Sequence, residues 1–207
     1  MNAIGGPKPA ARADRAGGPK NAALAKSKAT TALEKDLMRA EPGASTLTFR
    51  RMGSDDRRDV FALFSQLVLH DDFRLDSQAA YSGRPPDRAA IEAALGEALT
   101  LFVDRPDYGF VFMALENERV VACASVSYAI SLSLGKIVAQ MQHLVVAEGQ
   151  RRRGVGDALV AALVAQLRRI EIARLDVEVH VANEAAKQFF AQLGFKPSRE
   201  ERVALVL

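Results

Sequence analysis

Residues 151–156 have the types and spacing expected of an anion-binding turn. They read Arg-Arg-Arg-Gly-Val-Gly and precede a helical apolar pattern. The first N–H groups of a helix lack a partner within the helix and lie at the positive end of its dipole. Because Gly154 and Gly156 have no Cβ, a phosphate could approach these groups closely, and the three arginines add positive charge. The glycines alone favour a simpler interpretation, a tight connection flanked by solvated arginines.

Two common phosphate-binding motifs and a zinc site do not fit the residues present. The dinucleotide fingerprint G-x-G-x-x-G needs a glycine where Leu159 stands, and the Gly-Lys-Ser/Thr of the P-loop is absent. Three scattered histidines and one cysteine do not form a zinc-binding pattern. That cysteine, Cys123, lies in an apolar stretch without an adjacent histidine, so we expect a small buried core residue rather than a nucleophile.

The elements on both sides of residues 151–156 must position the turn. Residues 141–147 are apolar and β-branched, as in a buried strand, and Glu148 and Gly149 interrupt them. The stretch after the turn repeats apolar residues at helical spacing, at Leu159, Val160, Leu163, Val164 and Leu167. The sequence therefore predicts a strand, a glycine turn and a helix in succession.

The remaining elements follow from apolar periodicity. Helices are expected at residues 55–69, capped by Ser54, and at 87–103. Further strands are expected at 47–52, 110–115, 120–130, 174–182, near Phe195 and at 203–207. Consecutive strands between 110 and 147 predict an antiparallel meander, and the helix after the turn crosses over to a parallel strand. These elements predict a mixed α/β fold with helices on both faces of the sheet.

Two motifs in this order resemble the GNAT superfamily of N-acetyltransferases. Residues 151–156 match R/Q-x-x-G-x-G/A, and Val146 lies five residues before Arg151 at the end of an apolar stretch. A second block from Asn183 to Phe195 is close to N-x-x-A-x-x-[LF]-Y-x-x-x-G-F. The resemblance covers residues 46–207. It implies a three-layer αβα fold around a mostly antiparallel mixed sheet of six to seven strands, splayed at the strand that ends at Val146.

The resemblance also implies acetyl-CoA as cosubstrate and assigns residues to it, without a metal. Backbone groups of Leu144, Val145 and Val146 would pair with the pantetheine arm like an added strand, and one N–H would polarise the thioester carbonyl. Asn183 would contact the cofactor arm, a role compatible with capping the helix that follows it. The other cofactor-binding residues implied are Arg151, Arg152, Arg153, Gly154, Val155, Gly156 and Phe190.

The sequence departs from the family pattern at the groups that move protons. The family's usual acid, a tyrosine seven residues after the asparagine, is replaced by Phe190. The positions four and six residues before Val146, where many members carry a glutamate, are Gln142 and Gln140.

His143 and Tyr128 are the candidate catalytic residues that remain. His143 lies between the two glutamines; in a regular strand it would point to the opposite face, and a bulge could turn it inward. A structural histidine is the alternative interpretation, and a water relay without a dedicated base is equally compatible. Weaker candidates are Glu178, His180 and Tyr81.

We therefore expect an acetyl-CoA-dependent N-acetyltransferase that transfers the acetyl group directly to a primary amine of a small molecule or a protein. Three acids in an irregular segment, Asp71, Asp72 and Asp76, would attract a cationic acceptor, or they are solvated loop acids. The missing acid and base motivate a second hypothesis, a non-catalytic acyl-CoA-binding sensor or interaction module.

Composition bounds the partners and the location. Residues 1–46 contain eight Lys/Arg against four Asp/Glu, whereas the remainder contains 20 against 21, so no nucleic-acid footprint is expected over residues 46–207. No apolar run is long enough for a transmembrane helix, no secretory signal is recognisable, and the single cysteine fits the cytoplasm. Neither a nucleic-acid nor a membrane partner is therefore expected, and a homodimer is left open.

Residues 1–45 form a basic tail that lacks aromatic residues. The composition predicts a disordered or partly helical segment, because it cannot build a core. The alternatives are a basic arm for an acidic partner, a transit-like peptide, or a tail that is not translated because synthesis starts at Met38.

Overall fold

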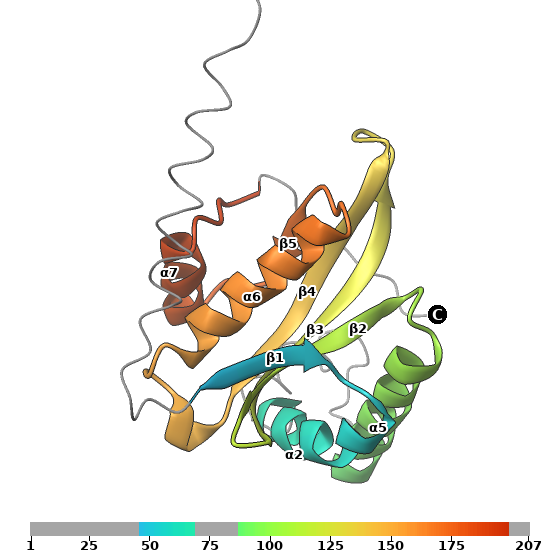
Figure 1. Cartoon of the computed structure of the whole chain (residues 1–207), viewed down its shortest axis with the longest axis vertical. Helices are drawn as coiled ribbons and strands as arrows, with labels where there is room; N and C mark the ends of the chain where they lie inside the picture. Colours follow the sequence, from blue (N-terminus) through green and yellow to red (C-terminus); the bar gives the residue numbers. More distant parts are fainter. Residues whose placement is uncertain (1–45, 69–86, 199–207) are drawn as a thin grey trace, which may run out of the picture. The chain divides into compact units, whose positions relative to one another are not determined.

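Strand residues with alternating apolar side chains build one mixed sheet (Figure 1). The computed structural model of the protein describes residues 46–68 and 87–198. The five strands are β1 (Leu47–Arg51), β2 (Gly109–Glu116), β3 (Arg119–Ser131), β4 (Lys136–Val146) and β5 (Leu175–Val177), and they pair in that order. The first four are antiparallel neighbours, whereas β5 runs parallel to β4. The predicted meander and parallel crossover are confirmed.

Helices cover both faces of this sheet, as the three-layer prediction requires. The longer helices are α2 (Arg57–Val68), α5 (Arg88–Asp104), α6 (Val155–Arg169) and α7 (Glu184–Gln192), and two short 3₁₀ turns are η1 (Ser54–Asp56) and η2 (Glu148–Gln150). Strand β2 shows how the period-2 pattern separates two cores. Phe110, Phe112 and Ala114 pack with α6 and α7, whereas Val111 and Met113 pack with α2 and α5. We call these two sides of the sheet the α6 face and the α2 face.

The predicted strand content is partly wrong. The strand expected at 174–182 forms only over Leu175–Val177, because β5 pairs with β4 no further than Met141. Phe195 does not start a strand; its N–H donates to the carbonyl of Phe190 at 3.0 Å, which closes the end of α7. The strand expected at 203–207 lies outside the described residues. The described part therefore has five strands where six to seven were expected for the whole domain.

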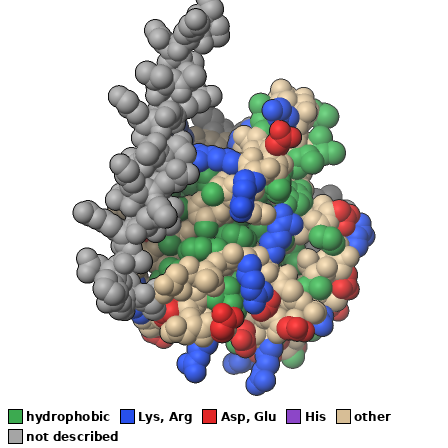
Figure 2. All heavy atoms as spheres, in the orientation of Figure 1, with side chains coloured by type: hydrophobic (Ala, Val, Ile, Leu, Met, Phe, Trp, Pro, Cys, Tyr) green, Lys and Arg blue, Asp and Glu red, His purple; other side chains and the backbone are tan. Residues whose placement is uncertain are grey.

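The β3–β4 hairpin carries apolar side chains at its tip. Ile130, Leu132, Leu134 and Ile137 are exposed there, and Figure 2 shows the hydrophobic surface that this end of the molecule presents. Ile130 and Ile137 are cross-strand partners.

Within the described residues, no helix combines the length and apolar character needed to cross a bilayer.

The start of α2 is held by an acidic residue and not by the predicted Ser54 cap. Asp56 Oδ2 accepts a hydrogen bond from the Gly53 N–H at 2.8 Å, and both Asp56 oxygens accept from the Arg50 guanidinium at 2.5 and 2.8 Å. The hydrogen bond from Arg50 holds the pKa of Asp56 below its ordinary value. The pair thereby ties β1 to the first turn before α2.

We expect Asp56→Asn to lower the free energy of unfolding by about 1 kcal/mol at pH 7, because it removes a charged cap and a partly exposed ion pair. A carboxylate with a lowered folded-state pKa stabilises the protein above its unfolded pKa. The stabilisation disappears as the pH falls through the folded value. Urea unfolding at pH 7 and at acidic pH should therefore show that the wild type and Asp56→Asn differ less in free energy of unfolding at the acidic pH. The exposed Asp55→Asn is the matched control, and an equal loss from both variants would contradict the assignment.

Candidate active site

The open edge of β4 lies where β4 and β5 separate. The pairing of the two strands ends at Met141 and Val177, and the last backbone contact is from the Glu178 N–H to the Met141 carbonyl at 3.3 Å. Beyond this point, β4 continues for five residues to Val146 while the chain after β5 turns away. In the described residues, this side of Leu144–Val146 has no strand partner, as the splay implied by the resemblance requires.

A cavity of about 420 Å³ lies along this open edge. Its walls come from the end of β4, the turn after it, α2 and α7. The lining residues are Gln66, Leu67, Leu144, Val145, Val146, Arg151, Arg152, Gly154, Gly156, Asp157 and Phe189. Seven of the predicted cofactor residues therefore line one cavity. Gln66, Leu67, Asp157 and Phe189 were not predicted; Phe189 could have been, because it occupies the [LF] position of the second motif.

The turn at residues 151–156 presents backbone donors to this cavity. Gly154 is the N-cap of α6 with φ of 77°, a left-handed conformation that favours glycine, and Arg152 also has positive φ, at 58°. The first hydrogen bond of α6 runs from the Ala158 N–H to the Gly154 carbonyl at 3.0 Å. The N–H groups of residues 155–157, in the first turn of α6, have no acceptor among the described residues, so they are available to an anion.

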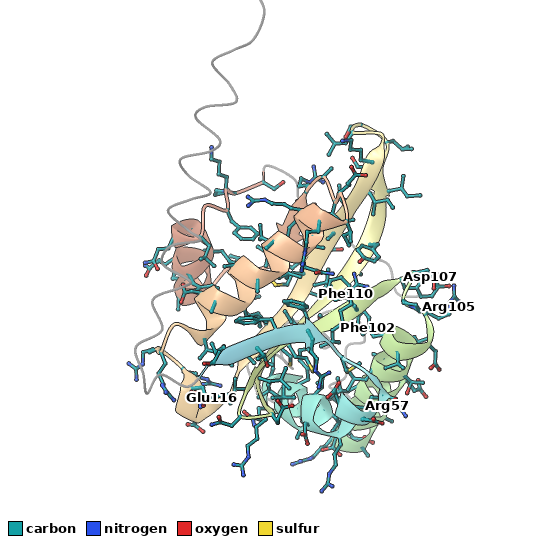
Figure 3. The ribbon with its side chains drawn as sticks, in the orientation of Figure 1. Arg57, Phe102, Arg105, Asp107, Phe110 and Glu116 are labelled. Atoms are coloured by element: carbon teal, nitrogen blue, oxygen red, sulfur yellow. The ribbon has the colours of Figure 1, made fainter. Side chains whose placement is uncertain are left out.

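Two arginines brace the turn through their side chains. Arg151 Nε donates to the Val146 carbonyl at 3.1 Å and thereby ties the turn to the end of β4. Arg153 donates to Gln150 Oε1 at 2.5 Å and lies 3.9 Å from Glu116, whose carboxylate also accepts from Gln150 Nε2 at 2.5 Å. Figure 3 shows Glu116 at the end of β2, beside this connection. These contacts fix the approach of β4 to α6 without using Arg152, which is exposed and lines the cavity.

Besides Arg153, three predicted cofactor residues do not line the cavity. Val155 is buried in the core beneath the turn. Asn183 Oδ1 accepts from the Ala186 N–H at 3.0 Å and caps α7, a role that is compatible with a cofactor contact. Phe190 is 7% exposed and packs edge-to-face against Phe189 and Phe195 at centroid distances of 5.0 and 5.3 Å. Cofactor contacts by these three residues stay a prediction.

We expect Phe190→Tyr to change turnover less than tenfold and to lower stability. A thiolate leaves tolerably without a proton donor near neutral pH, and a hydroxyl added inside an aromatic cluster costs about 1–3 kcal/mol unless it finds a partner. Turnover and melting temperature should be measured together, with Phe189→Tyr on the cavity wall as the comparison. A much larger gain in turnover from Phe190→Tyr would show that position 190 faces the departing sulfur after all.

A β-bulge on β4 decides where His143 points. Ser125 on β3 pairs with His143, whereas the next residue, Val126, pairs with Met141, so Gln142 is the extra residue. Met141 packs on the α6 face, but His143 lies against Phe64 of α2, with ring centroids 6.1 Å apart. The bulge therefore turns His143 onto the α2 face.

His143 lies among polar groups at the point where β4 and β5 separate. Its Nδ1 is 3.1 Å from the Ser125 hydroxyl. Gln140, which precedes the bulge, donates from Nε2 to Glu178 Oε1 just after β5. Burial lowers the pKa of His143 below its ordinary value of 6.5, and the Glu178 carboxylate acts in the opposite direction. A neutral imidazole near a carboxylate is suited to accept a proton near neutral pH.

Tyr128 is not brought together with His143. It packs in the cluster on the α6 face, near the ring of Phe110, and its hydroxyl accepts from Arg51 at 3.3 Å. The two candidate catalytic residues thus lie on opposite faces of the sheet, and catalysis by Tyr128 stays a prediction.

The other candidates are placed less favourably or not at all. His180 is exposed after β5, and its Nδ1 accepts from the Ala182 N–H at 3.2 Å. Cys123 is buried, as predicted, and burial raises the pKa of its thiol. Tyr81, Asp71, Asp72 and Asp76 lie outside the described residues. In residues 46–68 and 87–198, no group of three or more His, Cys, Asp or Glu side chains could hold a metal ion.

Comparison with known proteins identifies relatives of this arrangement. Residues 69–195 match the family model described as acetyltransferase (GNAT) family. Among curated proteins, no significant match was found.

Solved structures share the fold at low sequence identity. An aminoglycoside N-acetyltransferase in complex with CoA is 19% identical, with 81% of this chain and 98% of that chain covered at a TM-score of 0.58. The ribosomal-protein-alanine N-acetyltransferase of Brucella melitensis biovar Abortus 2308 is 12% identical, with coverage of 78% and 99% and a TM-score of 0.59. A transcriptional regulator of Bacillus halodurans C-125 is 17% identical, with coverage of 78% and 100% and a TM-score of 0.60.

Proposed function

The chain belongs to the acetyltransferase (GNAT) family, and we propose that it is an N-acetyltransferase that uses acetyl-CoA to acetylate a primary amine by direct transfer. The observation that carries the proposal is the cavity that joins the open edge of β4 to the backbone donors of residues 151–156. An extended strand edge suits the amides of a pantetheine arm, and a helix N-terminus with arginines suits a pyrophosphate. Both features lie in one cavity.

The space and the charges at the cavity support acetyl-CoA as the cosubstrate. Gly156 is half-buried, and a Cβ built there would lie 3.4 Å from Phe189 and 3.6 Å from Val146, so any larger side chain would occupy the cavity. Gly154 leaves open space on its surface. Arg151 and Arg152 bring positive charge, whereas Asp157 adds one negative charge in the first turn of α6. When bound there, acetyl-CoA would supply an activated thioester.

The residues of this chain would then hold the reactants and move a proton. An acceptor arriving as R–NH₃⁺ must lose a proton before its nitrogen lone pair can attack the thioester carbonyl carbon. We assign that proton to His143, which its burial keeps neutral. After the C–S bond breaks, the imidazolium returns the proton to the thiolate, and the second amine proton leaves to solvent. The products are the amide, free CoA thiol and one proton.

The proposal also covers the class of acceptor, the location of the protein and its assembly. Solved relatives named for aminoglycosides and for a ribosomal protein support amine acceptors of either kind, small molecule or protein. A cytoplasmic location is supported by the single, buried cysteine. A homodimer would find an apolar surface at the β3–β4 hairpin tip.

A second candidate function is favoured by one comparison. A relative titled as a transcriptional regulator has the same fold, and a non-catalytic acyl-CoA sensor would need the cavity but not His143.

Two measurements on the full chain separate the candidates: calorimetric titration with CoA, and release of CoA thiol from acetyl-CoA with a panel of primary amines. Binding accompanied by amine-dependent thiol release supports the transferase. Binding without release at any amine supports the sensor, and no binding removes both.

A further inference from the structure

Ser125 is the buried polar side chain on the α2 face that the reaction as described leaves unexplained. It is 5% exposed, and no other polar or charged residue in the described part of the chain is classed as buried. Its strand neighbours are Val111 on β2 and His143 on β4, and Cys123 lies two residues before it in an apolar cluster. A hydroxyl in such surroundings costs free energy unless it is hydrogen-bonded. Its partner is Nδ1 of His143, at 3.1 Å.

We propose that Ser125 is a positioning residue that keeps His143 in the tautomer with hydrogen on Nδ1, and that Glu178, anchored by Gln140, stabilises the imidazolium formed when Nε2 accepts a proton. The inference rests on the proposed function, because it assigns these groups to the proton transfer of the same reaction. It adds two residues, Ser125 and Glu178, to the site.

The reaction decides the tautomer, because a serine hydroxyl can either accept from Nδ1–H or donate to a bare Nδ1. Nδ1 is taken by a hydroxyl inside the sheet, so a substrate amine cannot reach it. Proton transfer must therefore use Nε2, which requires a lone pair there and the hydrogen on Nδ1. Nδ1–H then donates to Ser125 Oγ. The Gln142 bulge makes this possible, because it places His143 opposite Ser125 on the α2 face.

Among the described residues, groups near His143 come from α2, β3, β4 and the segment after β5. Phe64 of α2 contributes a ring, and Ser125 of β3 contributes a hydroxyl. Gln140 of β4 contributes an amide, and Glu178 after β5 contributes the carboxylate whose field raises the pKa of His143 against the effect of burial. Because Gln140 donates to Glu178, it holds that carboxylate at the point where the strands separate.

The direct test is the tautomer of His143, read from long-range ¹H–¹⁵N correlation spectra of the full chain at pH 7.5. The chain has three histidines, and His143→Gln assigns the signal. We expect hydrogen on Nδ1 in the wild type, loss of this preference in Ser125→Ala, and its return in Ser125→Thr, which keeps a hydroxyl. Ser127→Ala on the same strand is the matched control and should leave the spectrum unchanged.

Kinetics supply the second readout. Ser125→Ala should lower kcat about tenfold with little change in KM, as expected for loss of one orienting hydrogen bond. Glu178→Gln removes a group that raises the pKa of His143, so the acid limb of the kcat/KM profile should move to lower pH. This inference alone is overturned if the wild type is active and its Ser125→Ala variant keeps both the tautomer and the rate. It is also overturned if His143 of the wild type carries its hydrogen on Nε2. A wild type that binds CoA but transfers nothing overturns the proposed function instead.

Discussion

Gly156→Leu is expected to weaken CoA binding on the order of 100-fold while the protein stays folded. A Cβ at this position would meet Phe189 at 3.4 Å and Val146 at 3.6 Å, which is ordinary contact, so the rest of a leucine side chain must extend into the cavity. It would keep a phosphate from the N–H groups at the start of α6. Charge-assisted hydrogen bonds contribute about 1.5–3 kcal/mol each, and 1.4 kcal/mol is tenfold in affinity.

Calorimetric titration with CoA measures this effect, and thermal unfolding confirms that the variant folds. Gly149→Leu is the matched control, because a Cβ there meets nothing within 4 Å, its φ is not positive and it does not line the cavity. Equal affinities for wild type and a folded Gly156→Leu variant would show that the phosphates of CoA bind elsewhere.

His143→Gln is expected to lower kcat on the order of 100-fold or more, because general base catalysis is worth about 10²–10⁴-fold. A glutamine can retain a hydrogen bond to Ser125 but cannot accept the amine proton near neutral pH. CoA affinity should not change, because His143 does not line the cavity that holds residues 151–156.

The environment of His143 determines in which direction activity should change with pH. Burial favours the neutral imidazole, so the pKa of His143 is lowered and the base is available at neutral pH. Activity should therefore be lost as the pH falls through a value below the ordinary 6.5, and the His143→Gln variant should lack this limb. Tyr128→Phe separates the two candidates: if it lowers kcat and His143→Gln does not, the assignment is reversed.

The anion-binding turn could be predicted from the sequence because its determinants are local. Gly154 supplies the left-handed N-cap, and Gly156 leaves room beside Phe189 and Val146 that a larger side chain would fill. Both glycines stand within one six-residue motif. Strand order was also accessible, because short connections make the meander and the glycine turn forces the crossover. The seven predicted residues on the cavity wall belong to these two local features.

The proton-transfer site could not be predicted in the same way. The face on which His143 lies depends on one extra residue, Gln142, and no composition signal marks that bulge. Ser125 is 18 residues away in sequence and becomes a neighbour only through strand pairing. Phe190 occupies the tyrosine position of the motif, yet α7 buries its ring and places Phe189 on the cavity wall. Strand β5 is short because its pairing with β4 ends where the cavity opens.

The central claim is tested most directly by the initial rate of thiol release from acetyl-CoA, measured on the full chain with and without a saturating primary amine such as a polyamine, an aminoglycoside or a lysine peptide. We predict release that depends on the amine, is on the order of 100-fold slower or more in His143→Gln at saturating acetyl-CoA, and is accompanied by one acetylated amine per thiol. Release that is the same with and without every amine, from a protein that binds CoA, would contradict it.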